Sequence, residues 1–316
     1  MYAGGSMEQA GALFIQQANN QFSRKEQPAF DADKLSNDAD AIFFDANADG
    51  LPDLYVCSGG YGDLVANDPR LQDRLYLNDG KGNFTKSPNA LPVMNTSTAC
   101  VRVADANGDG RPDLFVGGRV VPGRYPETPK SFLLINDGRG KFTDQTAQLA
   151  PMLSTLGMVT DAAWVDLNTD HKPELVIVGE WMPLTVLALG SGGKLSDQTS
   201  TFFEKEYRGW WNKLLVDDLN GDGRPDLVVG NQGLNTQCRA SDKEPAELIY
   251  KDFDNNGKVD PILCLYVQGK SYPHATRMNC STNSVCFATN SPIMTVIRMR
   301  PWPMSLLKPS SKDRIN

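Results

Sequence analysis

Short apolar runs alternate with polar segments rich in Asp, Gly and Pro along most of the chain, and helical periodicity is almost absent. The runs are three to five residues long and are rich in aromatic and β-branched side chains, as at 41–44, 54–56, 114–116 and 227–229. Runs of this length and composition, bounded by turn-forming residues, are typical of β-strands. The pattern therefore predicts an all-β protein.

Two longer segments, 75–85 and 133–143, each read as a strand, an Asn-Asp-Gly turn and a second strand, which is a strong hairpin signal. An acidic segment recurs with its first Asp at 45, 105, 166, 218 and 252, so the repeat spacing is 60, 61, 52 and 34 residues. A period of this size with about four strands per repeat is typical of propeller blades. We therefore expect a β-propeller of four-stranded antiparallel blades, with about five blades present and about seven in a closed ring.

The acidic segment is a nine-residue loop with Asp at position 1, Asp or Asn at positions 3 and 5, usually Gly at position 6, and an acid at position 9. Three carboxylates in nine residues repel one another unless a cation lies among them. Oxygen ligands at positions 1, 3, 5 and 9, with the backbone carbonyl of position 7, suit Ca²⁺. Gly at position 6 permits the positive φ that folds a loop around an ion. The predicted ligands are Asp45, Asn47, Asp49, Leu51 and Asp53; Asp105, Asn107, Asp109, Arg111 and Asp113; Asp166, Asn168, Asp170, Lys172 and Glu174; Asp218, Asn220, Asp222, Arg224 and Asp226; and Asp252, Asp254, Asn256, Lys258 and Asp260.

The alternative for any single copy is a metal-free Asx turn. Five copies in one register favour metal, and we expect up to five Ca²⁺ ions. The third copy carries His171 in place of Gly and Glu174 in place of the closing Asp. His enters the left-handed region at some cost, and the longer acid changes the closing geometry, so we expect this site to be the weakest.

The net charge of -7 comes from these loops. They contain 15 of the 38 acids and 4 of the 31 Lys and Arg, which leaves 23 acids against 27 Lys and Arg elsewhere. The acidity is therefore local and predicts no acidic or basic partner. Basic clusters with interleaved aromatic residues, which are typical of nucleic-acid binding, are missing. No apolar run is long enough for a transmembrane helix.

Six scattered cysteines describe no disulfide framework, and we expect ordinary thiols, with Cys280–Cys286 as the one pairing to consider. Residues 1–5 match 114–118, just after a loop, which suggests that the chain opens inside a blade and is a fragment. The stretch from 278 to 316 is rich in Ser, Thr, Met and Pro, and we expect an atypical tail, either disordered or read in a shifted frame.

Over residues 1–277 the chain resembles the FG-GAP/VCBS repeat proteins, whose calcium loops recur in integrin α-subunit propellers. Segments such as 178–181, 209–212, 230–235 and 252–257 are most similar to bacterial secreted members related to cartilage acidic protein. Those members typically carry a further C-terminal module with an acidic helix, which this chain does not show. The resemblance implies that the loop residues are calcium ligands and that the protein is exported or displayed on the cell surface.

Three functions follow as hypotheses. The first is a non-catalytic, calcium-stabilised propeller that presents a binding or adhesion surface to an extracellular protein or glycan. The second is a propeller-type polysaccharide lyase or glycosidase, which needs two acids outside the loops, with Glu180, Glu204 and Glu206 as candidates. The third is an intracellular scaffold in which the loops are metal-free turns. Trp181, Trp210 and Trp211 suggest either a sugar-stacking platform or core packing, and core packing is the commoner role.

Overall fold

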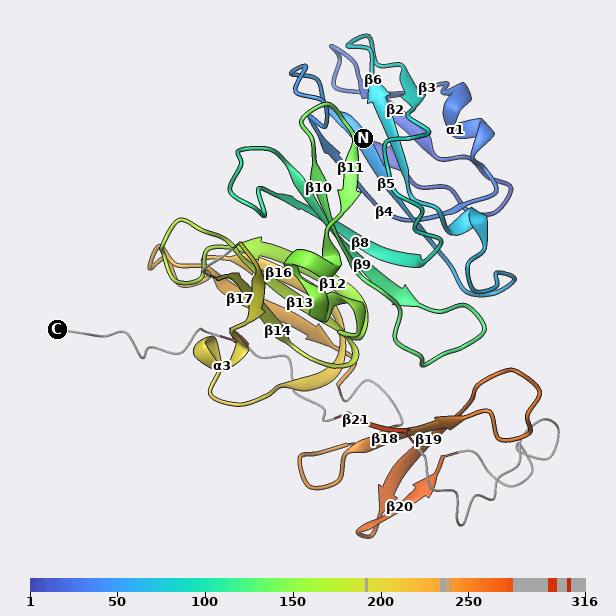
Figure 1. Ribbon diagram of the computed structural model, residues 1–316, viewed down its shortest axis with the longest axis vertical. Helices are drawn as coiled ribbons and strands as arrows, with labels where there is room; N and C mark the ends of the chain where they lie inside the picture. Colours follow the sequence, from blue (N-terminus) through green and yellow to red (C-terminus); the bar gives the residue numbers. More distant parts are fainter. Residues whose placement is uncertain (191–192, 234–237, 239, 275–294, 300–305, 308–316) are drawn as a thin grey trace. The chain divides into compact units, whose positions relative to one another are not determined.

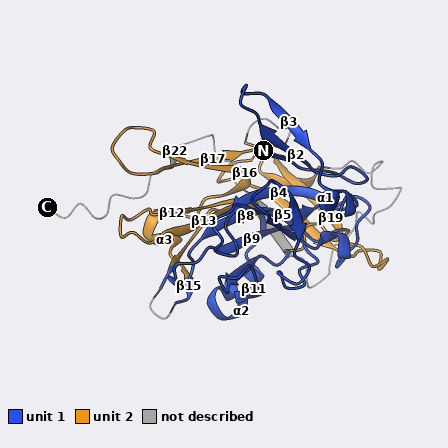
Figure 2. Cartoon of the chain, turned by 90° about the horizontal axis from the view of Figure 1, so that it is seen from above, with its two compact units in different colours: residues 1–122, 129–159, 189–195 blue, residues 123–128, 160–188, 196–316 orange. Residues whose placement is uncertain are grey.

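The computed structural model describes residues 1–190, 193–233, 238, 240–274, 295–299 and 306–307, the last two ranges as backbone only. The described chain is almost entirely β-sheet (Figure 1). It divides into two compact units (Figure 2). Unit 1 comprises Met1–Pro122, Pro129–Val159 and Leu189–Leu195, and unit 2 comprises Gly123–Thr128, Thr160–Ala188 and Ser196–Asn316.

Unit 1 contains one three-stranded and two four-stranded antiparallel sheets, in each of which neighbouring strands follow one another in sequence. The strands are β1 (Tyr2–Ala3), β2 (Ala12–Gln16) and β3 (Phe22–Lys25); β4 (Asn37–Phe44), β5 (Asp53–Gly59), β6 (Arg74–Asn78) and β7 (Phe84–Lys86); and β8 (Ser97–Ala104), β9 (Asp113–Val120), β10 (Phe132–Asn136) and β11 (Phe142–Asp144). Short helical turns lie between them: α1 (Pro28–Ala32), η1 (Pro69–Leu71), α2 (Thr146–Leu149) and η2 (Pro151–Ser154).

The three sheets repeat one register, which confirms the alignment of the first residues with the later repeats. The predicted hairpins at 75–85 and 133–143 form as β6–β7 and β10–β11. The equivalent pairs across them are Gln16↔Phe22, Asn78↔Phe84 and Asn136↔Phe142. The preceding strand pairs in the same way through Tyr2↔Leu13, Tyr55↔Leu75 and Phe115↔Leu133.

Strand β5 is buried on both faces, and its alternate residues enter different cores. Leu54 and Val56 pack in a cluster with Tyr76 and Phe84. Tyr55 belongs to the other cluster, which includes residues of β8 to β10. Since successive side chains of a strand point to opposite faces, this sheet is covered on both sides, as packed propeller blades require.

The third, fourth and fifth repeats supply the remaining strands. These are β12 (Met158–Val165), β13 (Glu174–Pro183), β14 (Thr185–Leu189) and β15 (Leu195–Asp197); β16 (Arg208–Asp217) and β17 (Asp226–Asn231); and β18 (Ala246–Lys251), β19 (Asp260–Val267), β20 (Lys270–Pro273), β21 (Thr295–Met299) and β22 (Leu306–Leu307). The helix α3 (Thr199–Phe202) lies between β15 and β16.

The third repeat forms the four expected strands, but the fourth repeat departs from the expectation. Among its described residues it supplies only β16 and β17, and β22 pairs with β17 on the far side. The physical reason lies in the sequence, since the fourth and fifth loops begin only 34 residues apart and no Asn-Asp-Gly hairpin lies between them. In addition, the end of β13 pairs with the start of β16 through a bulge between Glu180 and Met182, so one sheet joins two repeats.

The stretch 278–316 lies largely outside the described residues, apart from the two short strands β21 and β22. No helix in the described part of the chain has the length and apolar character needed to cross a membrane. Cys57, Cys100, Cys238 and Cys264 are free thiols, as expected. Cys280 and Cys286 lie outside the described residues.

Candidate metal-binding loops

All five nine-residue loops share one hydrogen-bonded frame built on the carboxylate at position 1. In the first loop (45–53), Asp45 Oδ1 accepts from the backbone N–H of Asp49 at 3.2 Å, and Oδ2 accepts from Gly50 at 2.8 Å. The same two bonds form in the second (105–113), third (166–174), fourth (218–226) and fifth (252–260) loops. The turn therefore folds each loop around its first carboxylate.

The side chains at positions 3 and 5 complete the frame. Asn47 Oδ1 accepts from Asp49 N at 3.1 Å, and Asp49 Oδ1 accepts from Leu51 N at 2.8 Å. Equivalent bonds occur in the other four loops. Each of these oxygens has two lone pairs and uses one or two of them here. The frame is an Asx turn in which the oxygens of positions 1 and 3 share one backbone donor, and oxygen ligands of this kind fit a hard cation such as Ca²⁺.

The acid at position 9 is buried in four of the five loops. It accepts from the backbone N–H of position 2, as Asp53 does from Ala46 and Asp113 does from Ala106, both at 3.1 Å. Burial raises the pKa of Asp53, and raises that of Asp113 to about 6, against the lowering effect of these hydrogen bonds. The buried acids are Asp53, Asp113, Glu174 and Asp226.

The fifth loop is different, since its closing acid Asp260 is only half-buried. Within the described residues, Asp252, Asp254 and Asp260 form the one group of three His, Cys, Asp or Glu residues whose ligand atoms lie within 4.8 Å of one another. This loop has Asp at position 3 and Asn at position 5, the reverse of the other four loops, so its three carboxylates are distributed differently. Charge repulsion among ligand groups is therefore greatest here.

An asparagine at the end of the third strand attaches each of the first two loops to its hairpin. The backbone N–H of Asn136 donates to Asp113 Oδ1 at 2.9 Å. The side-chain Nδ2 of Asn136 donates to the carbonyls of Pro112 at 3.1 Å and Ala46 at 2.9 Å. Asn78 bonds in the same way to Asp53 and Pro52. Our sequence reasoning missed this contact, although the Asn that precedes both Asp-Gly turns was its signal.

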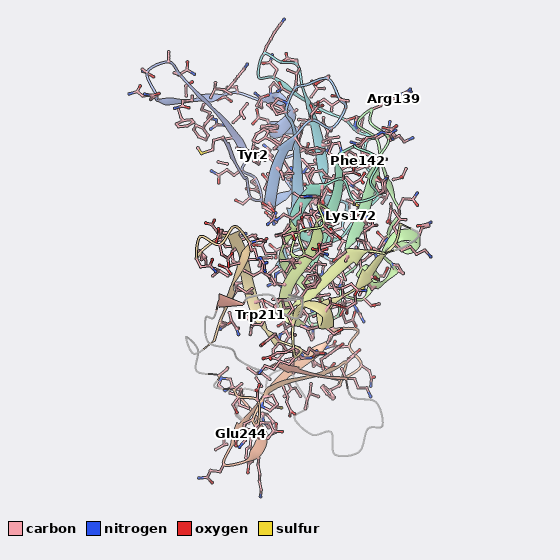
Figure 3. All side chains as sticks on the ribbon, turned by 90° about the vertical axis from the view of Figure 1, so that its left-hand side faces the viewer. Tyr2, Arg139, Phe142, Lys172, Trp211 and Glu244 are labelled. Atoms are coloured by element: carbon pink, nitrogen blue, oxygen red, sulfur yellow. The ribbon has the colours of Figure 1, made fainter. Side chains whose placement is uncertain are left out.

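The third loop lacks this asparagine, because Leu189 occupies the equivalent position in β14. Its Glu174 instead accepts from Asn168 Nδ2 at 3.2 Å within the loop. His171 has φ +64° and an almost fully exposed side chain, and the exposed Lys172 follows it (Figure 3). The structure thus shows the His in the strained left-handed region that the sequence predicted.

Position 4 also adopts a positive φ in all five loops, a second feature that sequence reasoning missed. The angle is +61° at Ala48, +63° at Thr169 and +56° at Asn255, while Gly108 and Gly221 fill the position in the other two loops. Those two glycines were the available signal, because glycine adopts this conformation without strain.

Two aspartates five residues before a loop join neighbouring repeats. Asp40 accepts from Ala41 N at 2.9 Å and from Val101 N of the next repeat at 3.2 Å. Asp161 does the same with Ala162 at 2.9 Å and Leu214 at 3.0 Å. These acids lie outside the loops, and their role follows from the packing of repeat on repeat.

The candidate catalytic acids form no comparable group. Glu180 is buried in β13, whereas Glu204 and Glu206 are exposed, and Glu206 bonds to Arg208. Asp73 is a further buried carboxyl group, which accepts from Ser58 N at 2.6 Å and from the hydroxyls of Tyr55 and Thr98 at 2.8 Å. Its burial raises its pKa to about 7.

The aromatic residues of unit 2 are mostly packing residues. Trp211 is 1% exposed and belongs to the core of this unit (Figure 3). Trp181 is 4% exposed, has φ +59° at the bulge of β13, and donates from Nε1 to Tyr125 Oη at 2.7 Å. Trp210 is half-buried, with its ring centroid 5.8 Å from that of Trp181.

Comparisons with known proteins agree with the repeat structure. No curated protein matches the chain. Among solved structures, it is similar to a lectin of Agrocybe aegerita described as recognising non-reducing terminal N-acetylglucosamine, with 13% identity, a TM-score of 0.46, and coverage of 86% of this chain and 74% of that chain. A likeness at this level carries no inference about function. A family model described as an FG-GAP-like repeat matches residues 60–116 and 166–229, which contain the second, third and fourth loops. These two regions of the chain are therefore FG-GAP-like repeats.

Proposed function

We propose that this protein is a non-catalytic, calcium-binding β-propeller that presents a binding or adhesion surface outside the cell. The observation that supports it is the common frame of the five loops, in which the side-chain oxygens of positions 1 and 3 accept from the backbone N–H of position 5, and the side chain of position 5 accepts from position 7. A chain that needed only turns has no physical reason to place three acids in each of them. The ligands are those predicted from the sequence, with the Asp166 loop the weakest of up to five sites.

In this proposal calcium is structural. Each loop connects two adjacent strands of a sheet, such as β4 and β5 around the first loop. A bound dication cancels the repulsion among three carboxylates and fixes the connection, so that binding free energy becomes folding free energy. Small oxygen-ligand loops of this kind reach the affinity range that suits the calcium concentration outside cells, which supports an extracellular or cell-surface location. The partner proposed is an extracellular protein or glycan.

The test is a thermal melt with and without chelator. We expect EDTA to lower the melting temperature by at least about 10 °C, because the loss of several dications leaves uncompensated carboxylates. All five tryptophans lie at 164, 181, 210, 211 and 302, outside unit 1. Tryptophan fluorescence therefore follows unit 2, while far-UV circular dichroism follows both units. EDTA preloaded with Ca²⁺ is the control, and identical melts in EDTA and in calcium would reject the proposal.

The alternative of a polysaccharide lyase or glycosidase has less support from the described residues. It requires acids that converge in a cleft, whereas Glu204 and Glu206 are exposed and Glu180 is buried. Turnover of a polysaccharide panel that is lost on substitution of one acid outside the loops would favour it.

A further inference from the structure

Six residues of the connection between β9 and β10, Gly123–Thr128, belong to unit 2 although the chain on either side belongs to unit 1 (Figure 2). Two adjacent side chains of this segment make contacts with different parts of unit 2. Arg124 contacts the fifth loop, and Tyr125 contacts Trp181. The segment thus links a candidate metal site to an aromatic pair.

Arg124 places a positive charge beside the fifth loop. Its Nη1 lies 3.5 Å from the carbonyl oxygen of Gly257, and its Nε and Nη2 bond to Glu127 at 2.5 and 2.6 Å. Glu127, and more weakly Asp252, raises the pKa of Arg124. A guanidinium therefore lies near the loop in which three carboxylates approach most closely.

A cation in this loop and the Arg124 guanidinium compete for the same negative charge. Without the dication, Arg124 offsets part of the repulsion among Asp252, Asp254 and Asp260. A dication among these three acids cancels two of their three negative charges, so the attraction on Arg124 weakens, while Glu127 remains its partner. By thermodynamic linkage, the free energy by which Arg124 stabilises the empty loop lowers the apparent affinity of that loop for the cation.

Tyr125, which follows Arg124 in the chain, contacts the aromatic pair of Trp181 and Trp210 through Trp181. Tyr125 accepts the indole N–H of Trp181, and the Trp181 ring lies against Trp210. Trp181 has a positive φ, which is rare for a bulky side chain and persists only where the surroundings fix it. A shift of the segment at Arg124 therefore changes the environment of both indoles.

We propose that the fifth loop is a regulated cation site whose affinity is lowered by Arg124, with Arg124 as the positioning residue that opposes the cation and the Arg124–Tyr125 pair as the link to Trp181 and Trp210. The inference rests on the proposed calcium function, and it goes further by giving one of the five loops a sensing role. It predicts that filling this loop changes the indole environment, which a purely structural site need not do.

The test combines calcium titration by calorimetry with tryptophan fluorescence on the full chain. Arg124→Gln is expected to tighten binding at the fifth loop by about 3- to 10-fold, because it removes the competing charge. The matched control is Arg24→Gln, which also removes an exposed arginine paired with an acid, Glu26, but in unit 1. That control is expected to leave calcium affinity unchanged.

Two further variants test separately whether the fifth loop causes the fluorescence change and whether Tyr125 transmits it to Trp181. The double variant Asp252→Asn, Asp254→Asn empties the fifth loop and is expected to abolish the fluorescence change assigned to it. This control is needed because Trp164 lies two residues before the third loop. Tyr125→Phe is expected to keep the binding stoichiometry and to reduce the fluorescence change, since it removes only the acceptor of the Trp181 N–H.

The outcomes distinguish the two proposals. If calcium binds, but Arg124→Gln leaves the affinity unchanged or weakens it, the sensing role is wrong and the structural role stands. The same holds if the fluorescence change is unaffected in the variant that lacks the fifth loop. If no calcium binds to any loop, both proposals fall together.

Discussion

The second and fifth loops share one nine-residue pattern and one hydrogen-bonded frame, yet the surrounding structure holds them very differently. Asp113 closes the second loop from a buried position and accepts from Ala106 on one side and Asn136 on the other. Asp260 closes the fifth loop half-buried, and within the described part of the chain the backbone donor to its carboxylate is Phe253. The difference shows that the motif determines the turn, whereas the neighbouring strand determines how strongly the turn is fixed.

Under the proposed calcium function, this contrast gives two copies of the motif different roles. A loop fixed by buried hydrogen bonds is preorganised, so a cation adds stability without changing its shape. A loop with few such bonds and the closest carboxylates depends on the cation for its order, and is the more suitable one to respond to it. Three matched pairs of substitutions test this contrast.

The largest effect is expected from the closing acids. Asp113→Ala leaves two backbone N–H groups without their acceptor in a buried site, and we expect a loss of about 3 kcal/mol of unfolding free energy in chelator. Asp260→Ala removes one bond at a half-exposed site and should cost about 1 kcal/mol. Urea unfolding gives both values, by circular dichroism for the first variant and by tryptophan fluorescence for the second. Equal losses would contradict the contrast.

A smaller effect is expected from the strand-end asparagines. Asn136→Leu introduces the residue that the third repeat has at this place and removes the bonds to Pro112 and Ala46, at an expected cost of about 2 kcal/mol. Asn78→Leu is the matched variant. Among the described residues, Asn78 Nδ2 donates to Pro52 O, so this substitution should cost about 1 kcal/mol. Chemical denaturation followed by circular dichroism measures both. If Asn78→Leu costs more, the bond to Ala46 is unimportant.

The smallest effect is expected at position 6. His171→Gly relieves a side chain at φ +64° and should stabilise the third loop by about 0.5 to 1 kcal/mol and tighten its calcium binding a few-fold. The matched variant is Gly110→His in the second loop, where a Cβ would meet no atom within 4 Å, so that only the φ of +82° opposes it. It should destabilise by a similar amount. Calorimetric titration of both variants checks the signs, and two changes of the same sign would show that φ is not the cause.

Much of the fold was predictable because it depends on local patterns. The hairpins at 75–85 and 133–143 follow from Asn-Asp-Gly turns between apolar runs, and the register of the first residues follows from their match to later repeats. The prediction of four strands in the fourth repeat was wrong. The spacing to the next loop is short and contains no hairpin signal, so the third and fourth strands of the blade are not supplied by the described residues of this repeat. The positive φ at position 6 of each loop was predictable from the motif. The differing number of hydrogen bonds that hold the closing acids was not visible in a motif nine residues long.

The sequence by itself determined the five turns, since Asp and Asn side chains bond to backbone N–H groups two to five residues ahead, whatever the rest of the fold does. Only the tertiary structure decided which loops are firmly held. Asn136 reaches Ala46 across 90 residues, Asp40 reaches Val101 across 61, and Arg124 reaches Gly257 across 133. Such contacts depend on which strands the fold brings together, and their energies depend on burial, which raises the cost of every unpaired polar group.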